Sequence, residues 1–491
     1  MFDKVKLIFR NSIIYSLGNL SIALTGYLLI PIYTKHLALA EYGLLGILEV
    51  TFQIISNIFG FALYEAYNRW YFEKSSTGKQ KSIFFTIVMF LIVIILVLNT
   101  VLFSLSERIS LLLFDTSELS YVFRLMVISA SLQILGRLPL TLMKLQQLAG
   151  FYAMSNIARL VSVLLFTIYF VVGLQRNLAG IYEAQIIGHI FYFLIILKYI
   201  AKNIEFRFES KILMDIWKYS YPLTLSAVIV MFLTVTDRYC LKFLANFEEI
   251  GIYSLGFKIA SGIKLLIMQS LYLAISPVIY QMMDAPDNKR FYSKLMTYLG
   301  LIVMIFVLGA SIFSREIIHI VARQESYYAA YIFIPILSLG VFFELLRDLS
   351  LTGINISKRT KIIPVIGFLV SIINLTVNLI LIPLIGAMGS AIATLTSNIL
   401  FFALIYIRAQ KIYFIPYELK KIFILVFVSA GLYYFSELFT NFNTIERIMS
   451  KSFILFAFPF VLYVLKFYEE IELQSFREIL TKMRINLYKS I

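Results

Sequence analysis

The chain has 491 residues, of which 60% are hydrophobic and 14% are charged, and its net charge is +15 at pH 7. A mean hydropathy of +0.87 leaves too little polar surface for a water-soluble globular protein. The single Cys240 excludes a disulfide framework within one chain. The positive charge does not indicate nucleic acid, because Lys and Arg lie mainly in short loops between apolar segments.

The dominant feature is a series of about fourteen apolar segments, each roughly 20 residues long, which is enough for a helix to cross the hydrocarbon core of a bilayer. We predict an all-α polytopic membrane protein in which the first segment is an uncleaved helix, since no small-residue cleavage site follows it. The predicted spans are 12–34, 43–68, 82–105, 120–145, 151–173, 178–201, 219–244, 251–280, 294–314, 327–351, 362–383, 386–407, 419–439 and 449–468.

The distribution of basic residues predicts the orientation. Of the 43 Lys and Arg residues, 29 fall in segments on the same side as the N-terminus and eight fall on the opposite side. Basic loops stay on the cytoplasmic side, so both termini are expected to be cytoplasmic. The remaining six basic residues lie inside predicted spans: Arg124, Arg137, Arg159, Arg238, Lys258 and Lys264.

Internal similarity predicts two related lobes. The residues after span 1, from Tyr33 to Gly43, resemble those after span 7, from Tyr239 to Gly251, and a second match links the starts of spans 6 and 12 at offsets of 206 to 209. Transporters are often built from such repeats, with the substrate path between them. We expect two pseudo-symmetric six-helix lobes and two further helices. The predicted units are 1–205 (N-lobe), 206–218 (cytoplasmic interfacial linker), 219–410 (C-lobe), 411–468 (helices 13 and 14) and 469–491 (tail).

The linker and the tail are both predicted to lie at the membrane surface. Trp217 suits the headgroup level, and in the tail an apolar stripe from Leu473 to Leu487 runs beside basic residues. Contact with anionic lipid is the preferred interpretation of the tail. Docking on a partner helix is the alternative.

Ionisable residues inside spans are costly in lipid and therefore mark candidate sites. Arg159, Lys258 and Lys264 lie deep, with no acidic neighbour at helical spacing, so we predict that they line a cationic cavity, followed by Arg137, Arg124 and Arg238. Acidic residues are candidates for ion coupling, although several have a basic neighbour and could form structural ion pairs. The candidates are Glu49, Glu65, Glu183, Asp237, Glu344 and Asp348, with Arg69 beside Glu65, Arg238 beside Asp237, and Arg347 beside the last two.

Polar residues form one-sided stripes on several spans. Such stripes either line a cavity or hold helices together, and the sequence leaves both interpretations open. The candidate wall residues are Ser155 and Ser162 on span 5, Gln133 on span 4, Asn374 and Asn378 on span 11, and Thr394 on span 12.

Signals for enzymatic chemistry are absent from the sequence. The three histidines are scattered, and no metal-binding motif, nucleophile elbow or nucleotide-binding loop is found. We therefore expect a transporter with no cofactor and no resident metal. A membrane glycosyltransferase is a remote alternative, because it would need a larger extracytoplasmic loop.

Three groups of residues carry a family resemblance: Leu29-Ile-Pro31 with Glu41-Tyr-Gly43, the pair Asp237-Arg238 with Glu249-Ile-Gly251, and the run from Asn374 to Thr394. They resemble the polysaccharide-transporter branch, the Wzx-type O-antigen flippases, of the multidrug/oligosaccharidyl-lipid/polysaccharide exporter superfamily. The match extends across the first twelve spans.

This resemblance implies a V-shaped flippase in the bacterial cytoplasmic (inner) membrane. Its substrate would be an undecaprenyl-diphosphate-linked oligosaccharide, whose two phosphate charges suit a cationic cavity. Membrane lipids, a polysaccharide polymerase and chain-length proteins are the implied partners, with no nucleic acid. Two alternatives from the same superfamily are a cation-coupled drug antiporter and a lipid II flippase. The absence of charge in span 1 disfavours both.

Overall fold

The computed structural model describes residues 24–73 and 76–470, together with the isolated residues 14, 15, 18, 20, 21 and 474. Within these residues every regular element is a helix and no strand occurs. Most of the predicted first span, 12–34, and nearly all of the predicted tail, 469–491, lie outside the described residues. The prediction of an all-α protein is confirmed.

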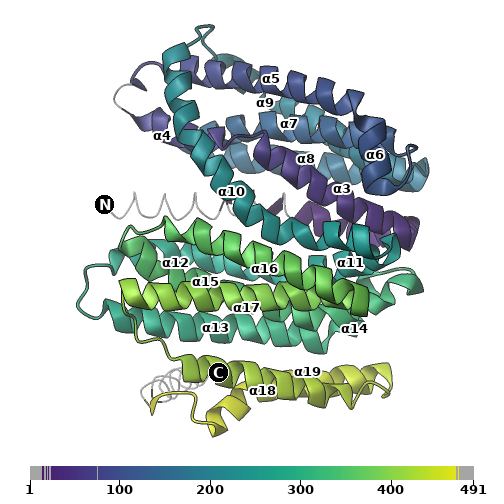
Figure 1. Ribbon diagram of the computed structural model, residues 1–491, viewed down its shortest axis with the longest axis vertical. Helices are drawn as coiled ribbons and strands as arrows, with labels where there is room; N and C mark the ends of the chain where they lie inside the picture. The colour runs from purple at the N-terminus through teal and green to yellow at the C-terminus, as the bar shows by residue number, and fades with distance from the viewer. Residues whose placement is uncertain are drawn as a thin grey trace, which may run out of the picture.

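The N-terminal half forms one bundle, drawn in purple and blue in Figure 1. Its apolar segments are helical because a segment in lipid must satisfy its backbone hydrogen bonds within itself. The elements are α2 (Ile30–His36), α3 (Leu39–Ile58), α4 (Leu63–Phe72), α5 (Gln80–Ser104), α6 (Ser106–Phe114), α7 (Ser120–Leu145), α8 (Ala149–Thr167), η2 (Ile168–Gly173) and α9 (Asn177–Lys202).

The C-terminal half forms a second bundle, followed by a separate helical pair at the bottom of Figure 1. The bundle elements are α10 (Ser210–Leu244), α11 (Phe247–Ile263), η3 (Lys264–Met268), α12 (Gln269–Gln281), α13 (Asn288–Ile312), α14 (Ser314–Val321), η4 (Glu325–Ile332), α15 (Phe333–Ile356), α16 (Ile362–Ile385) and α17 (Ala387–Ile412). The pair consists of α18 (Leu419–Glu437) and α19 (Thr444–Val464).

Twelve helices of the described residues are long and apolar enough to cross a membrane, or thirteen if the bent α10 is counted. Each of the thirteen predicted spans from 43–68 onward overlaps one of these helices, with α10 included. Large apolar side chains remain exposed around the bundle, among them Leu194, Phe427 and Phe456, each more than half exposed. An apolar exterior of this kind suits lipid contact, and the chain is a multi-pass membrane protein.

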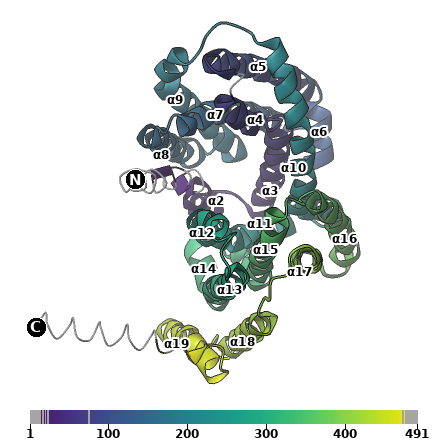
Figure 2. The same cartoon turned by 90° about the vertical axis from the view of Figure 1, so that its left-hand side faces the viewer.

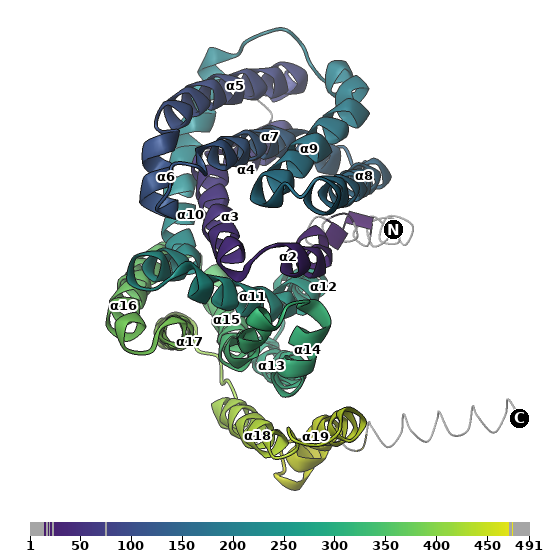
Figure 3. The same ribbon diagram turned by 90° about the vertical axis from the view of Figure 1, so that its right-hand side faces the viewer.

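Helices in the two halves begin at a nearly constant spacing. The starts of α3 and α11, at Leu39 and Phe247, are 208 residues apart, and the starts of α5 and α13, at Gln80 and Asn288, have the same separation. The short helices α6 and α14 repeat it again. The two bundles lie side by side and meet mainly through α3, α10 and α11, as the end-on views show (Figures 2 and 3).

The two bundles approach most closely at the end that carries α6 and α14, which is the side opposite the predicted cytoplasmic face and is called the outer end here (Figure 1). Gly43 and Gly251 face each other there: a Cβ on Gly43 would lie 1.8 Å from the carbonyl oxygen of Phe247. On the same side Lys242 of α10 forms an ion pair of 2.7 Å with Asp115 of the N-terminal bundle. The outer ends of the bundles are therefore packed together.

The long helix α10 connects the bundles and bends by 44° near its middle. Its first turns pack on the N-terminal bundle, where Trp217 contacts the rings of Phe61 and Phe90 and Ile216 is fully buried. The segment that we predicted to be an interfacial linker helix thus continues directly into α10. Trp217 packs in an aromatic cluster with Phe61 and Phe90, and its position at the headgroup level stays a prediction.

Ion clusters hold the pair α18–α19 against α13 and α14 at both ends. At one end Lys294 contacts Glu418 and Glu469, and at the other Lys451, which is fully buried, and Arg447 both contact Glu316. The middle of the pair packs on the bundle through apolar residues such as Leu425 and Phe458. Charges thus concentrate at the ends of the pair, and the buried Lys451 is neutralised there by Glu316.

Candidate substrate cavity

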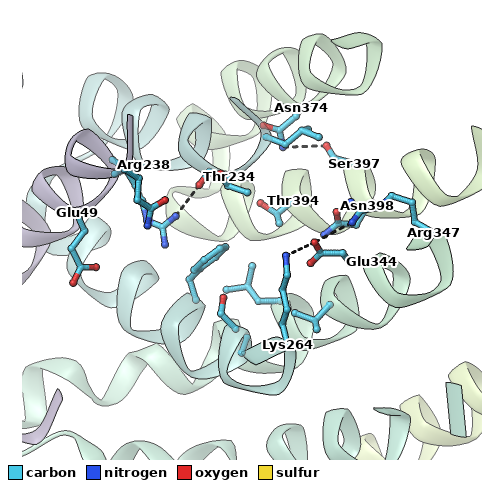
Figure 4. Close-up of a pocket in the computed structure, with 18 residues that line it drawn as sticks. Glu49, Thr234, Arg238, Lys264, Glu344, Arg347, Asn374, Thr394, Ser397 and Asn398 are labelled. Atoms are coloured by element: carbon cyan, nitrogen blue, oxygen red, sulfur yellow. Dashed lines mark hydrogen bonds and ion pairs between the residues drawn. The ribbon is translucent and has the colours of Figure 1, made fainter. Parts of the chain in front are cut away.

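Two adjoining cavities lie between the bundles. The first, of about 320 Å³, is built mainly by α10, α11, η3, α15, α16 and α17 (Figure 4). The second, of about 380 Å³, faces the N-terminal bundle and is lined by residues of α3, α7 and α9. Glu49 and Gln53 of α3 belong to both linings, so α3 forms the wall between them. Together they are called the central cavity here.

A stripe on α3 that we did not predict supplies much of this wall. Glu49, Gln53 and Asn57 are spaced four residues apart, and each of them lines at least one cavity between the bundles. Just beyond them the helix breaks between α3 and α4, where Phe61 and Ala62 have φ values of +46° and +47°. Non-glycine residues in this region are strained, and such strain concentrates at functional sites. The spacing of the three polar residues was readable in the sequence.

Lys258 lines the N-terminal side of the central cavity but is not an isolated cation. Its ammonium group lies 2.8 Å from a carboxylate oxygen of Glu49, which comes from the other bundle. Tyr27 also donates a hydrogen bond to the Lys258 carbonyl oxygen, at 3.0 Å. No acidic residue lies at helical spacing from Lys258 on its own helix. The counter-charge comes from Glu49 on α3.

Lys264, on the C-terminal side of the central cavity, is also paired with a carboxylate from another helix. It is the first residue of η3, a π-helical segment, and such segments are frequent at functional sites. Its ammonium group contacts Glu344 at 2.5 Å, and Arg347 contacts Glu344 at 3.2 Å and Asp348 at 2.7 Å. Two cations and two carboxylates therefore form one cluster, and Lys264, Glu344 and Arg347 line the cavity (Figure 4).

Two arginines of the central cavity have no carboxylate within ion-pair distance among the described residues. Arg238 donates to the Thr234 carbonyl oxygen at 3.1 Å and lies 4.0 Å from the ring centre of Phe257. Arg137 donates weakly to the Asn57 side chain, at 3.4 Å. A guanidinium in a semi-enclosed polar cavity with unused donors is suited to binding an anion.

Two predicted cavity cations lie elsewhere. Arg159, on α8, is partly buried and sits 5.9 Å from the ring centre of Tyr192, outside the linings of both cavities. Arg124 donates to the Ser106 hydroxyl at 2.8 Å near the outer end. Their participation in substrate binding stays a prediction, and the geometry gives it no direct support.

Asp237 is completely buried, more so than any other acidic residue that the structure describes. One carboxylate oxygen accepts hydrogen bonds from Tyr253 at 2.6 Å and from Thr394 at 2.7 Å. The other oxygen has no hydrogen-bond partner among the described residues. A polar network beside it links Asn374 and Asn378, and it also includes Ser390 and Ser397.

The remaining predicted residues divide between cavity wall and helix packing. Gln133 lines the central cavity and accepts from Ser56 at 3.1 Å, while Asn374 and Thr394 line its C-terminal side. The hydroxyls of Ser155 and Ser162 donate hydrogen bonds to the carbonyl oxygens of Phe151 and Ala158 on their own helix, at 2.6 Å and 2.9 Å.

The two other acidic candidates lie away from the central cavity. Glu183 forms an ion pair with Arg176 at 2.7 Å, and Glu65 is exposed. Arg69, the residue that we expected beside Glu65, instead contacts the rings of Trp70 and Tyr219. No group of three or more His, Cys, Asp or Glu residues suited to a metal ion occurs in the described part of the chain.

Comparison with solved structures places this arrangement among known transporter folds. A structure titled "Lipid II flippase MurJ, inward closed conformation" matches with a TM-score of 0.70 at 15% identity, covering 95% of this chain and 100% of that one. A multidrug resistance MATE family transporter of the MOP superfamily, in an inward-facing conformation, matches with a TM-score of 0.64 at 12% identity, covering 81% and 94%. The MATE transporter VcmN of Vibrio cholerae matches with a TM-score of 0.57 at 14% identity, covering 83% and 96%.

At these identities the likeness concerns the fold, and it shows the helical architecture of MOP-superfamily transporters. No curated protein matches the sequence. The family comparison is more specific, since residues 8–283, more than half of the chain, match the family described as "Polysaccharide biosynthesis protein". The chain belongs to this polysaccharide biosynthesis protein family and has the fold of MOP-superfamily transporters.

Proposed function

We propose that the protein is a flippase that moves an undecaprenyl-diphosphate-linked oligosaccharide across the cytoplasmic membrane by alternating access through the central cavity. The observation that carries this proposal is the charge of the cavity wall. Five basic residues but only two acidic ones line it: Arg137, Arg238, Lys258, Lys264 and Arg347 against Glu49 and Glu344. An excess of positive charge in a low-dielectric site favours an anionic substrate.

The two unpaired arginines suit a diphosphate in particular. Arg137 and Arg238 line different sides of the central cavity, so a substrate between the bundles could meet both. Guanidinium groups bind phosphate oxygens through two parallel hydrogen bonds, which makes such contacts strong and directional. Amide side chains on the wall, including Gln53 and Asn398, could bond sugar hydroxyls.

A further opening supports a substrate that carries a lipid chain. A cavity of about 630 Å³ between α10 and α16 presents a mainly apolar surface, and four of its eight lining residues are apolar: Ala227, Met231, Ile363 and Pro364. It shares Gln53 and Thr234 with the central cavity. A polyprenyl chain could remain in this apolar opening while the charged headgroup occupies the polar cavity.

Asp237 is our candidate for ion coupling. A buried carboxylate oxygen without a hydrogen-bond partner is costly, and a bound proton or a small cation would remove that cost. Thr394 donates to Asp237 and also lines the central cavity, so a change in charge at Asp237 could alter the substrate-facing wall. Glu49, Glu344 and Asp348 already contact cations and fit this role less well.

Two other functions of the same fold have specific support. A lipid II flippase is favoured by the likeness to MurJ over the full length of that structure. A cation-coupled drug antiporter is favoured by the MATE neighbours, although both carboxylates of the central cavity are held in ion pairs. A flippase for a lipid diphosphate needs a cavity that attracts an anion, whereas a drug antiporter needs one that attracts a cation. A cationic drug would be repelled by Arg137 and Arg238.

The test is to remove the unpaired cavity charges. A charge-assisted contact to phosphate contributes about 1.5–3 kcal/mol, so Arg137→Gln or Arg238→Gln should lower flipping of the lipid-linked glycan by roughly 10- to 150-fold, and Arg137→Glu should abolish it. Arg108→Gln, which removes an exposed charge near the outer end, is the matched control. Flipping is measured in proteoliposomes, with protein abundance and Tm recorded for each variant.

The result also separates the alternatives. Full flipping by a folded, abundant Arg137→Glu variant would refute the cationic-cavity mechanism. If the same variant gained export of cationic drugs in whole cells, the antiporter interpretation would replace it. Arg159→Ala and Lys264→Ala belong in the same series. We expect Lys264→Ala to impair flipping severely, while Arg159→Ala tests a prediction made from the sequence alone.

A further inference from the structure

A second basic feature lies outside the central cavity, at the end of the C-terminal bundle that is predicted to be cytoplasmic. It is a cleft of about 510 Å³ between the α15–α16 turn and the last turn of α17. Its lining contains five basic residues, two isoleucines and no acidic residue: Lys358, Arg359, Lys361, Arg408, Lys411, Ile362 and Ile412. It is called the basic cleft here.

The turn between α15 and α16 and the last turn of α17 bring the five cations together. After α15 ends, the N–H groups of Lys358 and Arg359 bond back to the carbonyls of Asn355 and Ile354, at 3.1 Å and 3.2 Å. Lys358 has a φ of +56°, a conformation usually reserved for glycine at the end of a helix. This tight turn aims residues 358–361 at the end of α17, where two further basic side chains, three residues apart, occupy one helical face.

The charges of the basic cleft are not neutralised within the protein. None of its five basic residues has a carboxylate within ion-pair distance among the described residues, and all five are exposed. Lys294 and Lys421, at the same end of the molecule, behave differently, since both contact Glu418. Retention of basic loops on the cytoplasmic side explains an excess of cations there, but not their concentration in one cleft without carboxylates.

The surroundings point to a ligand carried by a lipid. One turn beyond the cleft, α16 exposes Val365, Phe368 and Leu369, each 50% exposed or more, and α17 exposes Ile407. The cleft therefore lies where the polar end of the bundle meets its lipid-facing surface. Thr360, between two residues of the cleft, also lines the apolar opening next to the central cavity.

We propose that the basic cleft binds the phosphate groups of a membrane lipid at the cytoplasmic surface, and that the diphosphate of the lipid-linked substrate docks there before it enters the central cavity. Binding of a lipid phosphate follows from the cleft itself. The role in substrate uptake rests on the proposed function. Mutual repulsion among the five cations is relieved by a dianion, so a diphosphate should bind more tightly than a single phosphate.

The experiment measures binding at the basic cleft separately from binding in the central cavity. The full chain, with Cys240 replaced by Ala, carries an environment-sensitive fluorophore on Ser357→Cys, which adjoins the cleft without lining it. It is titrated in mixed micelles with farnesyl diphosphate, with phosphatidylglycerol and with inorganic diphosphate. Each basic residue near a membrane surface is worth about a fivefold factor in affinity, so Lys361→Gln with Lys411→Gln should weaken farnesyl diphosphate binding about 25-fold.

The matched control removes two exposed basic residues of the same face that lie outside the cleft, Lys202→Gln with Lys211→Gln, and should change binding less than twofold. Equal losses in the two double variants would overturn the proposal. Inorganic diphosphate that binds as tightly as farnesyl diphosphate would overturn the lipid part, and phosphatidylglycerol that binds as tightly would overturn the role in substrate uptake. In Arg137→Glu the fluorescent response should persist although flipping is lost, which keeps failure of the cleft distinct from failure of the central cavity.

Discussion

The contact between Gly43 and Gly251 makes a specific prediction about how the outer end opens. A Cβ on Gly43 would lie 1.8 Å from the Phe247 carbonyl oxygen, and one on Gly251 would lie 2.4 Å from the Leu39 carbonyl oxygen. Both clashes are with backbone atoms, which cannot rotate away. Gly43→Ala should therefore force α3 and α11 apart wherever the outer ends are packed as described.

The size of the effect follows from the geometry. Bringing the new Cβ to even 3.0 Å from the oxygen requires a displacement of about 1.2 Å. Forcing an extra methyl group into a packed contact costs typically 1–3 kcal/mol. The cost falls only on the state in which the outer ends touch. The equilibrium between closed and open outer ends should therefore shift toward opening by about 5- to 150-fold.

Labelling of a cysteine beneath this contact measures the shift. Ser254 is 6% exposed and lies about one turn below Gly251 on α11, against Gly46 of α3. In a Cys240→Ala background, Ser254→Cys should react with a membrane-impermeant maleimide from the outer side. Gly43→Ala should raise the rate of this reaction by as much as the shift in the equilibrium, about 5- to 150-fold.

The control for this experiment is Gly431→Ala in α18, where a Cβ would meet nothing within 4 Å. This change should leave labelling unaltered, and loss of Gly from a helix should if anything stabilise the protein slightly. If Gly43→Ala is folded, labels at the wild-type rate and flips substrate normally, then α3 and α11 do not form the outer barrier, and the reasoning from the close approach is wrong.

Three further predictions follow from the ends of the helices. An alkaline phosphatase fused after Ser311 should be active and one fused after Ile491 inactive, because basic loops favour cytoplasmic termini; activity at Ile491 would reverse the orientation. Deletion after Glu470 should preserve flipping with at most reduced abundance, and an inserted but inactive truncation would show that the tail takes part in transport. Burial raises the pKa of Glu418, but hydrogen bonds from Lys294 and neighbouring groups outweigh it and lower the pKa below the ordinary value. Its contribution to stability is therefore present above the unfolded pKa of about 4.3 and lost as pH falls through the folded value, so wild-type Tm should drop on acidification more than that of Glu418→Gln.

Much of the helical organisation could be predicted because membrane-spanning helices must be apolar over a fixed length. The predicted span 120–145 coincides with α7, and 362–383 lies within α16. The short surface helices α6 and α14 were missed, because eight or nine residues after a long apolar run give a weak periodic signal.

The candidate site was predictable in composition but not in pairing. Lys258 and Lys264 were predicted to line a cationic cavity, and their carboxylate partners Glu49 and Glu344 lie 209 and 80 residues away in the chain. Such contacts depend on how helices pack, and a single sequence does not specify that. The position of Arg159 illustrates the same limit, because depth in a span does not reveal which neighbour a side chain faces.

The continuity of α10 has a consequence for how the chain can be divided. Its first turns complete the hydrophobic core of the N-terminal bundle, since Ile216 is buried there together with Leu138 and Leu142 of α7. A half-protein that stops at the predicted boundary, 205, would leave that core open, and the other half would begin with an uncovered apolar face. A split after α10 would instead take from the C-terminal bundle the helix half that packs on α16 and carries Asp237, which bonds Thr394 of α17. Because α10 contributes to both cores, fragments divided on either side of it should assemble less stably than the intact chain.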